Sequence, residues 1–153
     1  MQSFKVLLLL SGLVVSAAAQ CTPHGSLTFR SPVTVAPGLA ATPIFAGLTT
    51  PRGIALDSHQ NLLVVERTFG ITAFTDSDPS CNGWLRTVVI SGAQFTQGIQ
   101  SHGNFLYVST DTQVLRYAYN PASRTISGSP VVIVSGIPAG GGMMPSSFLL
   151  RPS

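Results

Sequence analysis

Short runs of β-branched and aromatic residues, separated by clusters of Asp, Asn, Gly and Pro, recur along most of this chain. Three segments begin alike, at Gly47, Gly92 and Gly136, and their starts lie 45 and 44 residues apart. Repeats of that period are typical of propeller blades rather than of helical solenoids. Beyond the first twenty residues, no window shows the apolar period of about 3.6 residues that marks a helix. The pattern predicts an all-β chain built as a row of blades.

The strands inside the repeats align with one another. Each copy contains about four short segments of strand-forming residues bounded by turn residues, as expected of an antiparallel meander. The matching segments are residues 61–65 with 104–108, 71–74 with 114–117, and 88–91 with 132–135. We therefore predict a partial β-propeller with about two complete four-stranded blades and the start of a third.

The chain divides into four predicted parts: a signal peptide over residues 1–19, an N-terminal lead-in over 20–46, two blades over 47–141 and a divergent tail over 142–153. Propellers close with about four to eight blades, and closure protects the strand edges. Two blades do not close, so we expect a fragment, a splice or truncation product, or a homo-oligomer that covers its open blade edges.

The N-terminus carries one cation, Lys5, then an apolar run over residues 6–10 and 13–15, and small residues at 17–19 before Gln20. This order is typical of a cleaved secretory signal, which predicts an extracellular protein. A membrane anchor is the alternative, but the apolar run is short for a span.

Charge is sparse in the predicted mature chain. Seven Arg and five acidic residues leave a net charge of +2, and no Lys remains. Because no short segment gathers the Arg residues, nucleic acid and an anionic membrane are not expected partners.

Two cysteines, Cys21 and Cys81, follow the predicted cleavage point. An oxidising compartment favours a disulfide between them. Metal binding would need more ligands, and redox catalysis would need a closer pair.

Five motifs in order carry a resemblance to a known family. They read LTTPRGIALD at residues 48–57, LVVERTFGI at 63–71, LYVST at 106–110, VLRYAY at 114–119 and VVIVSGIPAGG at 131–141. By their order and spacing, residues 47–141 resemble the N-terminal part of secreted fungal pyrroloquinoline-quinone (PQQ)-dependent pyranose dehydrogenases, within the glucose/sorbosone dehydrogenase superfamily.

This resemblance implies a six-bladed propeller in the full-length family, with the quinone over the central channel and a calcium ion holding it. It also implies a sugar substrate oxidised at C1 and an electron acceptor, with a histidine taking the proton while hydride passes to the quinone. We therefore interpret the chain as a truncated or fragmentary member of these oxidoreductases.

Two departures from the family pattern predict that this chain is inactive and binds no cofactor by itself. The family shows Asn-His-Gly-Ile at the start of the second blade, whereas this chain has Gln97 at the histidine position. An amide does not take a proton near neutral pH, so no catalytic residue is expected here, and His102 lies in the wrong turn to replace it. After Gly141 the family continues into a histidine and a Thr-Arg stretch, but this chain diverges.

Arg52 and Arg67 are the candidate cofactor-binding residues, because guanidinium groups suit a tricarboxylate. The alternative is that each arginine forms a structural ion pair with Glu66 or Asp57. Four aspartates are candidate calcium ligands, because calcium prefers oxygen ligands. Each of them lies in a turn, however, where the Asp side chain commonly hydrogen-bonds a nearby backbone N–H, so no metal ligand is assigned. The aspartates considered are Asp57, Asp76, Asp78 and Asp111.

Two rival functions stay open at this point. Propeller faces also bind glycans or proteins without chemistry, so a secreted, non-catalytic carbohydrate- or protein-binding module is the second interpretation. An unstable product without function is the third.

Overall fold

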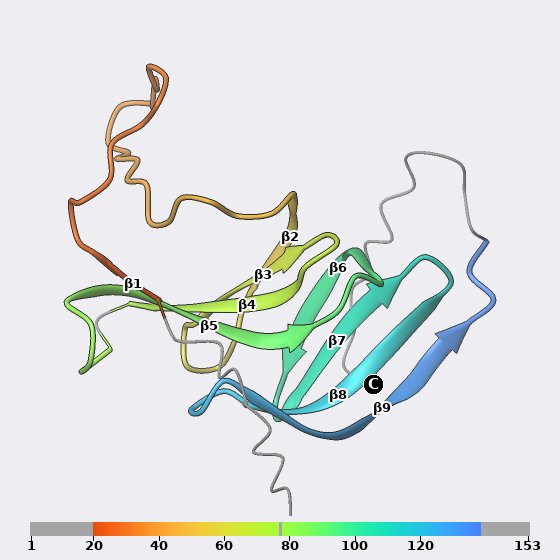
Figure 1. Cartoon of the computed structure of the whole chain (residues 1–153). Coiled ribbons are helices and arrows are strands. Elements are labelled where there is room, and N and C mark those ends of the chain that lie inside the picture. Colours follow the sequence, from red (N-terminus) through yellow and green to blue (C-terminus); the bar gives the residue numbers. More distant parts are fainter. Residues whose placement is uncertain (1–19, 77, 139–153) are drawn as a thin grey trace, which may run out of the picture.

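Nine β-strands in two antiparallel sheets form the part of the chain that the computed structural model describes, residues 20–76 and 78–138. Sheet A has the strand order β1-β5-β4-β3-β2, and sheet B has the order β6-β7-β8-β9 (Figure 1). The strands are β1 (Gln20–Pro23), β2 (Pro51–Leu56), β3 (Leu62–Glu66), β4 (Gly70–Asp76), β5 (Gly83–Ser91), β6 (Phe95–His102), β7 (Phe105–Thr110), β8 (Gln113–Asn120) and β9 (Thr125–Ser135).

The predicted all-β partial propeller is confirmed. β2 to β5 and β6 to β9 are two consecutive meanders, and the three pairs of aligned segments fall on β3 with β7, β4 with β8, and β5 with β9. No helix capable of crossing a membrane occurs in the described residues. The predicted signal peptide, the tail over 142–153 and the third blade beyond Pro138 lie outside the described residues.

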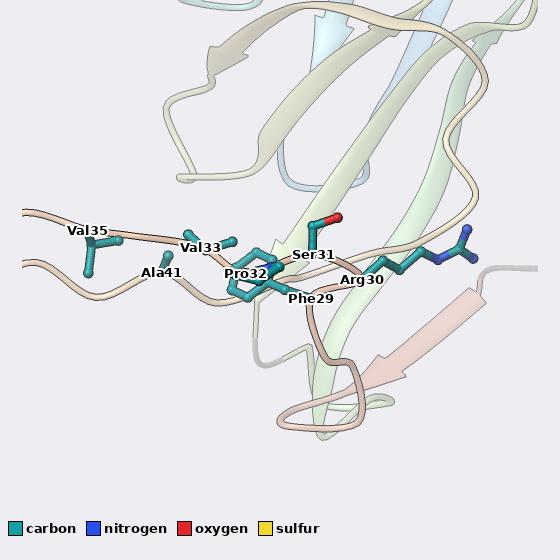
Figure 2. A pocket seen from close by; sticks show the side chains of 7 residues that line it. All are labelled: Phe29, Arg30, Ser31, Pro32, Val33, Val35 and Ala41. Atoms are coloured by element: carbon teal, nitrogen blue, oxygen red, sulfur yellow. The ribbon is translucent and has the colours of Figure 1, made fainter.

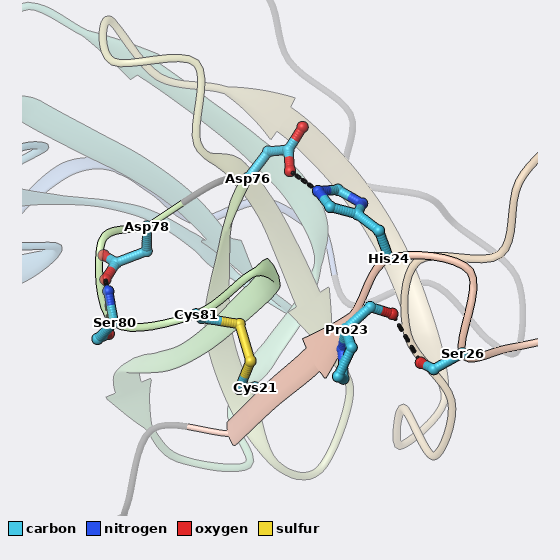
Figure 3. Close-up of a disulfide and its surroundings, with 8 residues drawn as sticks. All are labelled: Cys21, Pro23, His24, Ser26, Asp76, Asp78, Ser80 and Cys81. Carbon is cyan, nitrogen blue, oxygen red and sulfur yellow. Dashed lines mark hydrogen bonds and ion pairs between the residues drawn. A yellow bond between two sulfur atoms is a disulfide. The ribbon is translucent and has the colours of Figure 1, made fainter.

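A fifth strand, which the sequence pattern did not indicate, extends the outer edge of sheet A. β1 pairs antiparallel with β5, placing Cys21 opposite Leu85. The predicted disulfide between Cys21 and Cys81 is confirmed, with the two Cα atoms 5.6 Å apart (Figure 3). His24 Nε2 lies 2.9 Å from a carboxylate oxygen of Asp76 at the end of β4. The N-terminal strand is thus held to the first blade at both of its ends.

The hydrophobic core lies between the two sheets. In β3, Leu63 and Val65 point toward sheet B, and in β7, Leu106 and Val108 point toward sheet A; all four side chains are fully buried. Alternate residues of a strand face opposite sides, so each blade buries one face against the other. The remaining core members are Ile71, Ala73, Val89, Ile90, Phe95, Leu115, Tyr117 and Tyr119.

The lead-in covers part of the other face of sheet A. Phe45 lies against Phe74, with ring centroids 5.1 Å apart. Ile54 and Leu56 of β2, on the side away from sheet B, stay 68% and 56% exposed. One blade face is therefore buried by its neighbour and the other only partly by the chain that precedes it.

A polar cluster joins the two blades at the end of β2. Asp57, only 4% exposed, accepts hydrogen bonds from the backbone N–H groups of His59 and Asn61, both at 2.9 Å, which closes its own turn. Its other oxygen accepts from Asn61 Nδ2 and from the hydroxyl of Tyr119 in β8, both at 2.8 Å. Asn61 also donates to the carbonyl of Pro121 at 2.9 Å. The turn of the first blade is thereby bonded directly to the second.

The same cluster continues toward the disulfide loop. The hydroxyl of Thr75 donates to Asn61 Oδ1, and Arg124 donates to Thr75 at 3.0 Å and to Asp78 at 3.2 Å. These contacts span both blades, because Arg124 precedes β9. Most polar atoms of this cluster are paired, although the buried Nε of Arg124 has no hydrogen-bond partner in the described structure, and such networks fix the arrangement of neighbouring elements.

Removing the disulfide is expected to destabilise the first blade. The double variant Cys21→Ser, Cys81→Ser should lower the free energy of unfolding by about 2–4 kcal/mol, because the bond closes a long loop of the unfolded chain. Urea unfolding followed by tryptophan fluorescence of Trp84, which pairs with Thr22 of β1, measures this change. Equal midpoints for the double variant and the parent would contradict the expected role.

Tyr119 gives a test of the contact between blades. Burial, reinforced by the hydrogen bond and repulsion from Asp57, raises the pKa of Tyr119 above its ordinary value of 10.0. Tyr119→Phe should cost about 2 kcal/mol of stability, because a carboxylate loses a donor. A raised folded-state pKa gives stability that is present below pH 10.0 and lost as pH rises, since the unfolded tyrosine then ionises.

The stability difference between the parent and Tyr119→Phe should therefore shrink as pH rises beyond 10.0, as measured by urea unfolding at several pH values. Tyr107→Phe is the matched control, because Tyr107 lies half-buried in β7. A constant difference across the pH range would contradict the assigned hydrogen bond.

Candidate functional site

The two inner strands, β2 and β6, meet where the sheets adjoin (Figure 1). Both strands are irregular near their first residues. The pairing of β2 with β3 shifts register between Pro51 and Ile54, and the pairing of β6 with β7 shifts between Phe95 and Ile99. Bulges of this kind bend a strand and re-aim its side chains, and they are common beside active sites. The repeat thus places Arg52 and Gln97 at comparable positions of consecutive blades.

The bulges approach each other through their backbones. A Cβ atom added to Gly53 would lie 1.8 Å from the carbonyl oxygen of Gln97 and 3.3 Å from a methyl group of Ile99. Such a contact is impossible for any residue with a side chain unless the backbone moves. Glycine at position 53 is what allows Arg52 and Gln97 to lie next to each other.

Buried hydroxyl groups hold the bulge around Gln97. Ser109 in β7, fully buried, accepts a hydrogen bond from the N–H of Gly98 at 2.7 Å, and its Oγ lies 2.9 Å from the hydroxyl of Thr96. Gln97 itself is half-buried. Gln97, the residue at the position where the family has histidine, is therefore held in place by the hydrogen bonds of Thr96 and Gly98 to Ser109.

Arg67 stands beside the start of β2. Its N–H donates to the carbonyl of Thr50 at 3.2 Å, and the hydroxyl of Thr50 donates to the carbonyl of Arg67 at 2.9 Å. Arg52 follows two residues later, and both arginines are exposed. Within the described residues, neither guanidinium group forms an ion pair. The structure thus brings Arg52, Arg67 and Gln97 to the same end of the inner strands.

The alternative that Arg52 and Arg67 form ion pairs with Glu66 or Asp57 is wrong, because Glu66 forms its ion pair with Arg86. The Glu66 carboxylate, fully buried, lies 2.6 Å from a guanidinium nitrogen of Arg86 in β5. It also accepts hydrogen bonds from the Thr72 hydroxyl and the Thr49 N–H, both at 2.7 Å. Asp57, the other proposed partner, is bonded to Asn61 and Tyr119.

The guanidinium group of Arg86, the partner of Glu66, lies between two aromatic rings. Its guanidinium carbon is 5.1 Å from the ring centroid of Phe45 and 5.0 Å from that of Phe69. Cations over aromatic faces are attracted to them. Through Thr49, the pair also anchors the chain that leads into β2 and hence the position of Arg52.

Four of the five described acidic residues, Asp57, Glu66, Asp76 and Asp78, are engaged in contacts with other protein groups, and Asp111 lies exposed in the turn between β7 and β8. Asp78 accepts hydrogen bonds from the N–H and hydroxyl of Ser80, and these bonds lower the pKa of the Asp78 carboxyl (Figure 3). Asp57 closes its own turn, as predicted, and Asp76 lies beside His24. No group of three or more His, Cys, Asp or Glu residues with metal-binding geometry occurs among the described residues.

Two hollows lie away from the inner-strand bulges. One, of about 570 Å³, is formed within the lead-in by Phe29, Arg30, Ser31, Pro32, Val33, Val35 and Ala41 (Figure 2). Another, of about 630 Å³, lies beside the disulfide and is lined by residues 20–22, 45–47 and Arg86. Neither includes Arg52, Arg67 or Gln97, so these hollows are separate from the predicted cofactor contacts.

Comparison with known proteins identifies the class. The family described as TrAA12-like matches residues 33–151, and the chain belongs to this family. It is 36% identical over 106 residues to a pyrroloquinoline quinone-dependent pyranose dehydrogenase of Coprinopsis cinerea, covering 68% of this chain and 14% of that protein. It is 32% identical over 115 residues to a pyrroloquinoline quinone-dependent sugar dehydrogenase of Hypocrea jecorina, covering 71% and 26%.

Solved structures agree with the sequence relatives. The holo form of the PQQ domain of the Coprinopsis cinerea pyranose dehydrogenase matches with a TM-score of 0.68 and 34% identity, over 78% of this chain and 29% of that one. The calcium structure of Trichoderma reesei family AA12 matches with a TM-score of 0.53 and 27% identity, over 62% and 25%. The predicted resemblance to fungal PQQ-dependent sugar dehydrogenases is confirmed, for a chain that spans a minor part of its relatives.

Sequence reasoning missed the residues that support this end of the strands. Ser109 aligns with Glu66 when the repeats are superimposed, and both are fully buried polar residues that bond the start of an inner strand. The signal was present, because a polar residue ends each matching apolar run. Arg86 had no such signal, since its partner lies twenty residues away on another strand.

Substituting Gly53 tests the close approach of the bulges. Gly53→Ala should lower the free energy of unfolding by about 1–3 kcal/mol, because the new methyl group meets the backbone of Gln97. Thermal and urea unfolding measure the loss. Gly103→Asn is the control, since Gly103 has open space around it and Asn tolerates its positive φ. Equal stability of both variants would show that β2 and β6 do not approach as described.

Proposed function

We propose that this chain forms two neighbouring blades of a PQQ-dependent sugar dehydrogenase propeller, and that Arg52 and Arg67 contact the carboxylates of the quinone. The observation that carries this proposal is the position of two exposed guanidinium groups, without ion-pair partners in the described structure, beside the paired bulges of β2 and β6. Family membership supports the assignment of the quinone as the anion.

The residues present suit the carboxylates of the quinone but do not provide a site for its calcium ion. Guanidinium groups match carboxylates in shape and charge, so Arg52 and Arg67 suit a tricarboxylate. Calcium needs several oxygen ligands, and the described carboxylates of Asp57, Glu66 and Asp78 are already bonded to other protein groups. Asp111, in the exposed turn between β7 and β8, supplies one further carboxylate, which is too few for calcium, so a calcium ion of the complete propeller would take most of its ligands from elsewhere.

The chain by itself is proposed to be inactive toward sugars. The quinone, when bound, supplies the hydride acceptor, and the reaction also needs a base near the sugar hydroxyl. Gln97, held by Gly98 and Thr96, donates and accepts hydrogen bonds but takes no proton near neutral pH. Its proposed role is to bind and orient a polar group at this end of the strands.

We propose that the chain is secreted, because of its N-terminal sequence pattern and its disulfide. The charge, apolar run and small-residue exit of residues 1–19 have the form of a cleaved signal, and the disulfide between Cys21 and Cys81 suits an oxidising compartment. Expression of the full chain in a yeast host, followed by intact mass measurement of the medium, should find a product that begins at Gln20. A product retained in the cells with residues 1–19 attached would contradict this.

Cofactor binding is tested with the secreted full chain. Because the sequence predicts that this chain alone holds no cofactor, calorimetric titration with PQQ, with and without calcium, should show at most weak binding through the two arginines that does not depend on calcium. The double variant Arg52→Ala, Arg67→Ala should weaken it at least tenfold, because each charged hydrogen bond contributes about 1.5–3 kcal/mol. Arg30→Ala, in the lead-in, is the matched control and should leave binding unchanged.

Dye reduction with aldoses in the presence of PQQ and calcium should stay at the level of the quinone alone. Turnover above that level would contradict the inactivity proposed from Gln97. Equal loss of PQQ binding in the Arg30 control and in the double variant would contradict the assigned arginines.

A further inference from the structure

Gln20 is both the first residue of β1 and the first residue that cleavage of the predicted signal would leave. Small residues at positions 17–19 stand just before it, as at the exit of a secretory signal. A glutamine in that position carries a free α-amine and, at the end of its own side chain, an amide carbon that the amine can reach through a five-membered ring. The cleaved chain would therefore begin with a residue able to react with itself.

The structure holds this residue against the first blade. Gln20 lies opposite Arg86 in the antiparallel pairing of β1 with β5, and the next residue, Cys21, is joined to Cys81. Gln20 is exposed, and its amide oxygen accepts a hydrogen bond from Nη1 of Arg86 at 3.2 Å. The end that cleavage would create is thus a fixed strand end beside a guanidinium group rather than a loose tail.

A charged terminal amine would be unfavourable at this strand end. It would bring a second positive charge to the residue that faces Arg86, and like charges on facing residues destabilise a sheet. Arg86 already has an acid partner, because its Nη2 lies 2.6 Å from the carboxylate of the fully buried Glu66. Blocking a terminal amine removes its charge. The fold therefore favours a neutral first residue.

A cyclised Gln20 fits the same place. The ring uses only the backbone nitrogen and the side chain of Gln20, so the pairing of β1 from Cys21 to Pro23 does not have to change. The side-chain oxygen stays in the product as the ring carbonyl, and it therefore remains an acceptor for Arg86. Gln20 also borders the open hollow of about 630 Å³ beside the disulfide, which leaves room for the ring.

We propose that Gln20 is a modification site, which is converted to pyroglutamate once the signal has been removed. The α-amine nitrogen attacks the side-chain carbon Cδ, so that an N–Cδ bond forms and the Cδ–Nε2 bond breaks. One proton passes from the attacking to the leaving nitrogen, and ammonia departs; neither an oxidant nor a second substrate is required. The inference rests on the proposed secretion, because an uncleaved chain has no free amine at this position. The secreted protein then begins with an uncharged ring, which protects it from aminopeptidases that need a free amine.

Intact mass measurement and Edman sequencing of the undigested chain, secreted from yeast, test the proposal. The mass should correspond to residues 20–153 with the disulfide formed, less one molecule of ammonia. Edman sequencing should give no first residue until pyroglutamyl aminopeptidase is applied to the reduced, unfolded chain, which should then read from residue 21. Gln20→Asn is the matched control, because its side chain is one carbon shorter and would need a strained four-membered ring. It should keep a free amine and lose no ammonia.

A second readout tests the position beside Arg86. The cyclised parent should be more stable than Gln20→Asn in urea unfolding, because the variant keeps an ammonium group that faces Arg86. The difference should shrink at high salt, since salt screens the repulsion between exposed charges. A difference that does not depend on salt would contradict the charge argument.

Two results would overturn the proposal. One is a product of residues 20–153 at its full mass whose first Edman residue is glutamine, which leaves the proposed secretion standing. The other is the same loss of ammonia from Gln20→Asn, which would place the reaction elsewhere in the chain. A product that still carries residues 1–19 would contradict the proposed secretion and, with it, this inference, and its larger mass separates that failure from the other two.

Discussion

The burial of one face of each blade against the other is the constraint on which the rest of this structure depends. A four-stranded sheet has an apolar face that needs cover, and here Leu63 and Val65 of one blade meet Leu106 and Val108 of the next. Hydrophobic burial is the main favourable term in folding, so neither blade has a complete core without its neighbour. The bonds of Asp57 with Tyr119 and of Asn61 with Pro121 then select one alignment of the two sheets.

That alignment is what creates the candidate site. The inner strands come close enough that position 53 has no room for a side chain, and their bulges bring Arg52 beside Gln97. Buried polar groups hold both bulges in place. Ser109 bonds the bulge of β6, and the Glu66–Arg86 pair bonds the chain that leads into the bulge of β2. Breaking a buried ion pair on one side is strongly destabilising, by about 3–5 kcal/mol, so this pair fixes the start of β2 firmly.

Much of the fold was predictable because it repeats. The starts at Gly47 and Gly92 indicated the blade period, the alternating apolar runs indicated the strands, and two cysteines after a predicted secretory signal indicated the disulfide. β1 was not predictable, because four residues carry too little periodicity and because its partner strand β5 is distant in the sequence. The partner of Glu66 was also missed, since sequence proximity pointed to Arg67 whereas the fold brings Arg86 to it from across the sheet.

The central claim, that the two blades share one core and open together, is tested most directly by native-state hydrogen exchange on the purified chain. The amides of Leu63 in β3 and Leu106 in β7 lie in different sheets but bury their side chains in the same cluster. The account predicts the same free energy of opening for both amides, equal to the global free energy of unfolding. A second blade that exchanges at much lower free energy than the first would contradict it.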